Sequence, residues 1–350
     1  MRTLKKVNLN KKRVLLRVDF NVPLSKRGDI LDDFRIKQTL PTINYLLDKK
    51  AKVILISHLG RPKLQKRLMP KQKKFSLEPI AQILAKMLQR KVKFYPGCVG
   101  EKVQKEISGM KEGEVLLLEN LRFYQEEEKA DDNFAKELSK LADFFVNDAF
   151  GVSHRAHASI VGVTKYLPSA AGLLLEKEVN ILRDLMRKPE KPLVAIIGGA
   201  KVETKAVLIN KISEKADYLL VGGLINREIT AKDIYLNFPK KIVAPVDEID
   251  KKDIGPETVK LFRQKIFIAK TIFFNGVLGQ TENASYKKGT EEILKAIVKS
   301  GAFSVIGGGD TVEFVNMLGL TSKFNHVSTG GGAMIAFLAG EKLPGIEVLK

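Results

Sequence analysis

With 350 residues, the chain is long enough for about two domains that each bury a hydrophobic core. Its 44% hydrophobic and 29% charged residues are typical of a soluble globular protein, no run reaches the roughly 18 apolar residues of a membrane-spanning helix, and the single cysteine excludes an internal disulfide. The net charge of +20 favours capture of anions and by itself would permit nucleic-acid binding, but the chain has no tryptophan and no RNA-binding motif, which argues against a nucleic-acid partner.

The first half of the chain alternates short apolar runs with longer amphipathic stretches. Leucine-rich and β-branched runs are typical of buried strands, whereas apolar residues at helical spacing, as between Leu77 and Leu88, indicate helices. We expect strands at 13–18, 52–57, 115–119 and 144–147, and helices at 36–48, 77–90, 101–108 and 131–142.

The second half resumes the same alternation after a connecting helix. That helix is expected over about 173–187, because Pro189 and Pro192 end the amphipathic pattern. Further strands are expected at 193–197, 217–221, 270–274 and 302–306, and further helices at 202–214, 256–267, 289–299 and 311–318. Strand–helix alternation with fully apolar strands predicts an α/β protein with two Rossmann-like, three-layer domains of parallel sheet, which we expect to face each other across a cleft.

Polar side chains follow each expected strand of the first half. They are Asp19 and Asn21, His58 and Arg61, Arg122, and Arg155 and His157, and Arg35 opens the first helix. Ligands of open α/β sheets bind outside the carboxyl ends of the strands, so these residues predict one basic pocket for a small polyanion. The alternative for any single arginine is a surface ion pair, and for the segment 147–159 a solvated loop.

Glycine-rich turns follow three strands of the second half, at 198–200, 307–309 and 330–332. Glycine lets backbone N–H groups approach a phosphate at a helix start. Lys201 and Lys205 lie four residues apart, on one face of the helix that begins there. Asp310 either caps its helix alone or also holds Mg²⁺ beside a nucleotide phosphate. The chain contains neither a P-loop motif nor a standard dinucleotide fingerprint.

The chain resembles the phosphoglycerate kinase family in eight segments that follow in the family's order. They are RVDFNVP, SHLGRP, LENLRFY, NDAFGVSHRAHAS, IIGGAKVETK, DIGPETVKLF, GGGD and HVSTGGGA. The resemblance extends over nearly the whole chain. It implies a cytoplasmic, two-lobed glycolytic kinase, a phosphotransferase with a carboxyl acceptor, that moves a phosphoryl group reversibly between 1,3-bisphosphoglycerate and MgADP to yield 3-phosphoglycerate and MgATP.

The resemblance also implies a domain for each substrate. Residues 1–170 would bind 3-phosphoglycerate, 171–190 would form the interdomain helix and hinge, and 191–337 would bind nucleotide. The C-terminal tail 338–350 is a candidate for packing back on the first domain. The chain is expected to be a monomer without a membrane partner.

Site residues are carried over from the matching motifs. The implied substrate-binding residues are Asp19, Asn21, Arg35, His58, Arg61, Arg122, Arg155 and His157, with Arg17 and His154 adding to the basic patch. The implied nucleotide-binding residues are Gly199, Lys201, Lys205, Gly222, Asn275, Glu282, Gly308, Gly309, Asp310 and Thr311, with Asp310 as the magnesium ligand. The implied catalytic residues are Arg35, Lys205, Gly330 and Gly331.

The second half departs from the family pattern on the side of the nucleotide base. The family's Trp-Asn-Gly-Pro reads Phe274-Asn275-Gly276-Val277, and the stretch from Gly222 to about Ile254 is shorter than the family norm. The alternative to an active kinase is therefore a pseudokinase that binds phosphoglycerate but binds nucleotide weakly.

Overall fold

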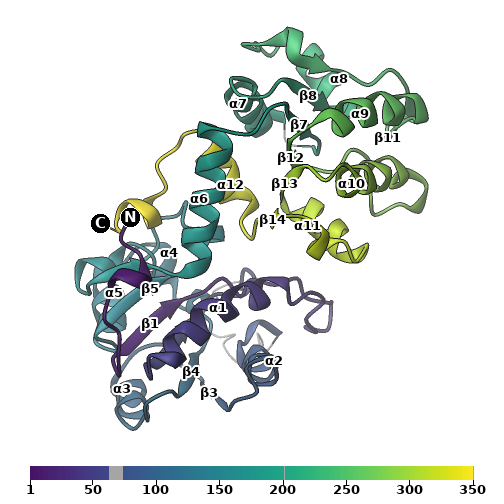
Figure 1. Ribbon diagram of the computed structural model, residues 1–350. Coiled ribbons are helices and arrows are strands. Elements are labelled where there is room, and N and C mark those ends of the chain that lie inside the picture. The colour runs from purple at the N-terminus through teal and green to yellow at the C-terminus, as the bar shows by residue number, and fades with distance from the viewer. Residues whose placement is uncertain (63–73, 201, 350) are drawn as a thin grey trace. The chain divides into compact units, whose positions relative to one another are not determined.

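The computed structural model describes residues 1–62, 74–200 and 202–349 (Figure 1). The chain divides into two compact units, the first made of Met1–Val179 with Lys342–Lys350 and the second of Asn180–Glu341. It passes from the first unit to the second within helix α6 (Leu173–Arg187). Each unit holds a six-stranded parallel sheet, so the expected α/β class with two parallel-sheet domains is confirmed. None of the described helices is long and apolar enough to cross a bilayer.

The sheet of the first unit has the strand order β3-β4-β2-β1-β5-β6. Its strands are β1 (Arg13–Arg17), β2 (Lys52–Ile56), β3 (Val92–Tyr95), β4 (Val115–Leu118), β5 (Phe144–Asn147) and β6 (Ser169–Ala171). All neighbouring strands pair in parallel, with Arg13 opposite Lys52 and Val14 opposite Phe144. The central strands β2, β1 and β5 carry almost only buried residues, because helices cover both faces of the sheet.

Successive residues along a strand of the first sheet pack against different helices on opposite faces of the sheet. Val14 and Leu16 belong to a core with residues of α1 and α2, whereas Leu15 belongs to a core with residues of α3 and α5. This follows from the strand period of two, which sends successive side chains to opposite faces. The helices are α1 (Phe34–Asp48), α2 (Glu78–Leu88), α3 (Glu101–Ser108), α4 (Gln125–Glu128) and α5 (Asp132–Ser139).

The sheet of the second unit has the order β14-β13-β12-β7-β8-β9 and is also parallel. Its strands are β7 (Leu193–Ile197), β8 (Tyr218–Val221), β9 (Ile242–Val243), β12 (Thr271–Asn275), β13 (Phe303–Gly307) and β14 (His326–Val327). The helices of this unit beyond α6 are α7 (Val202–Ser213), α8 (Gly223–Ala231), α9 (Pro256–Ile268), α10 (Lys288–Ser300), α11 (Gly309–Met317) and α12 (Gly331–Leu338). Helix α13 (Pro344–Glu347) lies in the C-terminal segment, which belongs to the first unit.

The sequence pattern missed the strands at the sheet edges. Strands β3, β6, β9 and β14 have two to four residues, and every residue of β3 is only half-buried, so no continuous apolar run marks it. The pattern also missed a hairpin of β10 (Glu248–Ile249) and β11 (Asp253–Ile254). In its turn, Asp250 and Lys251 have φ angles of 49 and 55, which is the left-handed conformation. Glycine at these positions would have predicted the turn, whereas aspartate and lysine do not.

Candidate functional site

The polar residues predicted for the first half lie at the carboxyl ends of the strands of the first sheet. Asp19 and Asn21 follow β1, His58 follows β2, and Arg122 follows β4. The segment with Arg155 and His157 follows β5. Because β4, β2, β1 and β5 are consecutive parallel neighbours in the sheet, their carboxyl ends bring these residues together.

Asp19 is the acidic residue of this group, and it holds Arg35. Asp19 is 4% exposed, and its Oδ2 accepts a hydrogen bond of 3.0 Å from a terminal nitrogen of Arg35. The same arginine nitrogen donates to the carbonyl oxygen of Asn21 at 2.9 Å. The Arg35 side chain remains 28% exposed, so the guanidinium is oriented by the protein and still open to a ligand.

The backbone of Gly60 connects the loops after β1, β2 and β4 by hydrogen bonds. Its N–H donates to Asn21 Oδ1 at 2.8 Å, and its carbonyl oxygen accepts from Arg122 at 2.7 Å. Gly60 itself has a φ of 63, and a Cβ there would lie 2.3 Å from the ring of Phe75. Glycine is therefore needed at this position to hold Asn21 and Arg122 in the same site.

Three arginines line one pocket of about 340 Å³ at the carboxyl ends of these strands. They are Arg61, Arg122 and Arg155, and the pocket also contacts Pro62, Tyr124 and Glu128. Arg122 lies 3.2 Å from a carboxylate oxygen of Glu128. Neither Arg61 nor Arg155 has an ion-pair partner within residues 1–62, 74–200 and 202–349. The pocket therefore carries an excess of positive charge that suits a small anion with carboxylate or phosphate groups.

The two histidines of the site are neutral at physiological pH. Burial, followed by the charges of Arg17 and Arg122, holds the pKa of His58 well below its usual range. Burial and the same two arginines lower the pKa of His157 to about 4. His58 Nδ1 lies 3.2 Å from a terminal nitrogen of Arg17, which can only donate, so Nδ1 accepts and the other ring nitrogen carries the proton.

A buried cluster of Arg17, Glu127 and Ser159 supports the site and was missed in part by the sequence analysis. Arg17 is fully buried, and its Nε donates to Ser159 Oγ at 2.9 Å. Glu127 Oε2 accepts from the backbone N–H of Ser159 at 2.9 Å. Glu127 belongs to the run Glu126–Glu128, which reads as a solvated acidic stretch, so nothing in the sequence signals that its middle residue is buried.

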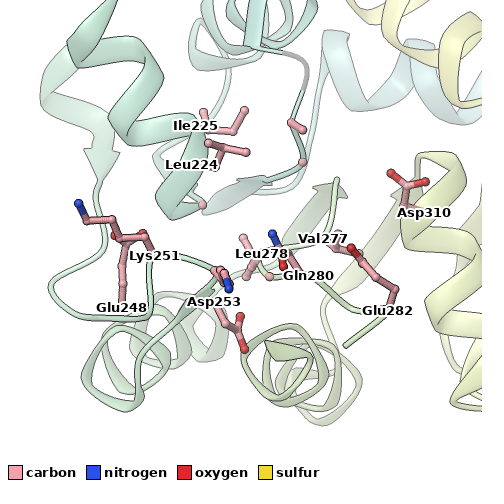
Figure 2. A pocket seen from close by; sticks show the side chains of 15 residues that line it. Leu224, Ile225, Glu248, Lys251, Asp253, Val277, Leu278, Gln280, Glu282 and Asp310 are labelled. Carbon is pink, nitrogen blue, oxygen red and sulfur yellow. The ribbon is translucent and has the colours of Figure 1, made fainter. Parts of the chain in front are cut away.

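The residues predicted for the second half gather around a separate pocket in the second unit. The pocket has a volume of about 250 Å³, and four of the predicted residues line it: Gly199, Gly222, Glu282 and Asp310. Figure 2 shows Glu282 and Asp310 toward one end and Glu248 and Lys251 toward the other. Apolar side chains line the part between these ends: Leu224, Ile225, Val277 and Leu278.

Lys205 lies buried beside this pocket. Its Nζ contacts Asn275 Oδ1, and Asn275 Nδ2 in turn donates to the carbonyl oxygen of Gly307 at 2.9 Å. Burial lowers the pKa of Lys205 to about 8, although the carboxylate of Asp310 opposes the shift. The Cε atom of Lys205 lies 3.9 Å from the position of a Cβ on Gly199, so this lysine reaches the predicted glycine turn.

The glycine turns before α11 and α12 pack directly against each other. A Cβ on Gly331 would lie 3.1 Å from Gly308 Cα and 3.3 Å from Gly309 N. Gly330 is the N-cap of α12, and Gly308 is the N-cap of α11 with a φ of 104. Two helix N-termini are thus held next to each other, and both have backbone N–H groups that suit an anion.

Asp310 does not cap α11, which corrects one part of the sequence analysis. The N-cap is Gly308, and Asp310 is the second residue of the helix and makes no cap hydrogen bond. Thr311, the next residue, uses its Oγ1 to accept from the N–H of Gly276 at 2.9 Å. The Asp310 side chain is exposed at the pocket, so its carboxylate is available to a ligand.

The donor set fits a magnesium ion that arrives with a nucleotide. Among the described residues, no group of three histidine, cysteine or acidic side chains could hold a metal by itself. Mg²⁺ is commonly bound by one or two carboxylates together with substrate phosphates. Asp310 supplies one such carboxylate beside the glycine turns. Lys201, which was also predicted to bind nucleotide, lies outside the described residues.

Charged residues of the β10–β11 hairpin also line the pocket and were not predicted. Glu248 forms an ion pair with Arg227, whose guanidinium also donates to the carbonyl oxygen of Lys251 at 2.8 Å. Asp253 is buried and accepts from the N–H of Gly289 at 2.8 Å. Glu248 and Lys251 lie in the shortened stretch, before the matching segment DIGPETVKLF, which begins at Asp253.

Comparison with known proteins gives a consistent result over the whole chain. The family model described as phosphoglycerate kinase matches residues 4–235 and 228–341. Phosphoglycerate kinase of Dictyoglomus turgidum is 45% identical over 389 aligned positions, which cover 98% of this chain and 96% of the relative. The corresponding protein of Coprothermobacter proteolyticus is 40% identical, with 100% and 98% covered.

Solved structures agree with the sequence matches. Phosphoglycerate kinase from Pyrococcus horikoshii OT3 superposes with a TM-score of 0.88 at 33% identity and covers 100% of this chain and 98% of that one. The structure of phosphoglycerate kinase from Coxiella burnetii has a TM-score of 0.82 at 34% identity, with 99% and 98% covered.

Proposed function

Because this chain belongs to the phosphoglycerate kinase family of glycolytic enzymes, we propose that it transfers a phosphoryl group reversibly from 1,3-bisphosphoglycerate to MgADP, giving 3-phosphoglycerate and MgATP. The observation that carries the proposal is the presence of two unlike anion sites in one chain. The first unit has an arginine-lined pocket, and the second has a pocket bordered by glycine turns and a buried lysine.

The first unit binds the phosphoglycerate. This substrate carries a phosphate, a carboxyl group and a hydroxyl group, and the sheet edge offers a partner for each. The guanidinium groups of Arg61, Arg122 and Arg155 suit the anionic groups, since each presents several N–H donors in a rigid plane. Asp19 and Asn21 provide acceptor and donor groups for the hydroxyl. His58 and His157 add polar groups that carry no charge.

The second unit binds the nucleotide. The phosphates lie toward Asp310, where the N-termini of α11 and α12 and the ammonium of Lys205 favour negative charge. Gly199, Gly308 and Gly309 let the backbone approach the phosphates, while Asn275 and Thr311 hold the turns in place. The base packs in the apolar part of the pocket near Gly222, and Glu282 accepts from the ribose.

Magnesium belongs to the nucleotide substrate. Asp310 would hold it, and the ion would neutralise phosphate charge when it is bound. Lys205 keeps an ammonium beside the same phosphates, and Arg35 offers a guanidinium to the phosphoryl group on the glycerate side. Phosphoryl transfer depends mainly on positioning and on neutralising charge, so no nucleophilic side chain and no general base are needed.

The transfer itself exchanges one phosphorus–oxygen bond for another. A β-phosphate oxygen of ADP forms the new bond to phosphorus, the bond to the acyl oxygen breaks, and 3-phosphoglycerate leaves as a carboxylate. Arg35, Lys205 and the N–H groups at Gly330 and Gly331 are the donors that we assign to the transferring group. The reaction requires that the acyl phosphate on one unit reach the nucleotide on the other.

A coupled assay of ATP formation from 1,3-bisphosphoglycerate and MgADP tests this function. We expect turnover that requires magnesium, by a protein that elutes as a monomer, and we propose that the reaction takes place in the cytoplasm. Calorimetric titration should show separate binding of 3-phosphoglycerate and MgADP. Tight binding of 3-phosphoglycerate with neither turnover nor nucleotide binding would contradict the kinase and support the pseudokinase.

The affinity for MgADP is expected to fall about tenfold between pH 7 and pH 9. Lys205 binds phosphate as an ammonium, and with a pKa of about 8 only roughly one lysine in ten stays charged at pH 9. Binding of an anion favours the charged form, so affinity is greatest below the pKa and is lost as the pH rises through it. Calorimetry at four pH values measures this dependence.

The matched control for this pH dependence is Lys205→Arg. A guanidinium keeps its charge over the whole range, so the affinity of this variant should not change with pH even where its absolute value is lower. A wild-type affinity that stays constant from pH 7 to pH 9 would contradict the assignment of Lys205 to the phosphates.

A further inference from the structure

The first turn of α6 is held by two buried side chains from distant parts of the chain. The N–H of Leu173 donates to Thr42 Oγ1 at 3.0 Å. The N–H groups of Leu174 and Leu175 donate to Asp148 Oδ1 at 2.9 and 3.1 Å. The first N–H groups of a helix have no partner within the helix, so these three bonds satisfy groups that would otherwise be buried and unpaired.

Gly172 makes room for this arrangement. It precedes α6, and it has no side chain with which to cap the helix. A Cβ at this position would lie 2.2 Å from Asp148 Oδ1. Glycine at residue 172 therefore leaves the place of the usual capping side chain to the Asp148 carboxylate, which is completely buried.

The capping residues belong to the elements that carry the substrate-side residues. Thr42 is fully buried in α1, the helix that begins beside Arg35. Asp148 directly follows β5 and precedes the segment with Arg155 and His157. The start of α6 is thus bonded to both elements, and α6 is the helix within which the chain enters the second unit.

The return of the chain to the first unit is anchored at the same corner. Asn147, the neighbour of Asp148, donates from Nδ2 to the carbonyl oxygen of Gly345 at 3.0 Å. The N–H of Gly345 donates to the carbonyl oxygen of Ser153 at 2.9 Å. The start of α6 and the segment that follows the return of the chain are therefore both bonded to residues 147–153, next to the segment with Arg155 and His157.

We propose that Thr42 and Asp148 are positioning residues for phosphoryl transfer, because they fix the start of α6 to the two elements that hold the phosphoglycerate. The inference rests on the proposed function and goes beyond it, since neither residue lines either of the pockets that we assign to the substrates. Loss of the cap leaves both binding sites intact, but it frees the start of the helix that connects them. The transfer step then slows, while the binding of each substrate alone does not change.

Thr42→Val and Thr42→Ser in the full chain test this role. Valine keeps the shape of threonine and removes the acceptor oxygen, whereas serine retains the oxygen. We expect a five- to tenfold lower kcat for Thr42→Val, about the size of a lost helix cap, with Kd values for 3-phosphoglycerate and MgADP within about twofold of wild type. Thr42→Ser should restore kcat. Hydrogen exchange at the first turn of α6 should rise in Thr42→Val and stay at the wild-type level in Thr42→Ser.

A second variant covers the case in which Thr42→Val does not fold. Gly172→Ala displaces the Asp148 carboxylate from the other side and should show the same fall in kcat with unchanged Kd values. An unchanged kcat in Thr42→Val, or a higher Kd for 3-phosphoglycerate in the same proportion as the lost turnover, would overturn the proposal, as would loss of folding in both variants. If the wild-type chain shows no turnover, the proposed function fails, whereas hydrogen exchange still tests the cap.

Discussion

Lys205→Ala is expected to lower kcat by about 10²- to 10³-fold and to leave the Kd for 3-phosphoglycerate unchanged. The variant removes the buried ammonium that we propose to contact the nucleotide phosphates, and loss of one such preorganised donor commonly costs this much in rate. The residues that we propose for 3-phosphoglycerate binding all lie in the other unit, so the substitution does not alter them. Steady-state kinetics of ATP formation and calorimetric titration with 3-phosphoglycerate measure the two quantities.

Lys211→Ala is the matched control on the same helix. Lys211 lies in the last turn of α7 and forms an exposed ion pair with Glu214 at 3.0 Å, so its loss should leave kcat and both Kd values within about twofold of wild type. A Lys205→Ala variant that loses 3-phosphoglycerate binding, or one that keeps its full turnover, would contradict the assignment of Lys205.

Arg35→Ala is expected to lower kcat/KM for 1,3-bisphosphoglycerate by about 10²-fold with only a small change in melting temperature. Arg35 is 28% exposed and is held by Asp19 and the Asn21 carbonyl, so it is oriented toward ligand without being part of the core. Its ion pair with Asp19 is partly screened by solvent, which limits its contribution to stability. Initial rates and a thermal melt of the same sample measure both effects.

Arg13→Ala is the control that shows whether the effect of Arg35→Ala arises from the reaction or from the loss of an ion pair. Arg13 forms an ion pair with Asp143 at 2.6 Å at the opposite, amino end of β1 and β5. It is therefore an arginine–aspartate pair of the same kind without access to the substrate site, and its loss should not change kcat/KM. A strongly lowered melting temperature for Arg35→Ala alone would show that Arg35 serves the fold and not the reaction.

The extent of sequence-based prediction differs between the central and the peripheral parts of the sheets. The central strands β1, β2, β5, β7 and β12 were predicted because both of their faces are buried, which produces an unbroken apolar run. Strands β3 and β9 lie at sheet edges and carry half-buried residues, so tertiary pairing and not local composition makes them strands.

Motif order revealed most of the candidate site, but not the residues that support it. Asp19 and Arg122 were predicted because each follows a strand of the same sheet, and Arg35 because it opens the first helix. Glu127 and Thr42 were not predicted, since an acidic run and a helical threonine look solvated or neutral in sequence. Their roles arise only from contacts with Ser159, 32 residues away, and with Leu173, 131 residues away.

The sequence by itself determined the α/β class, the order of the central elements, the family and the polar residues at the strand ends, because each of these depends on local periodicity or on short motifs. The tertiary structure alone decided which residues share a pocket, that Gly308 and not Asp310 caps α11, and that Thr42 and Asp148 hold the start of α6. These features depend on distances between residues far apart in the chain, and only packing of the completed sheets sets those distances.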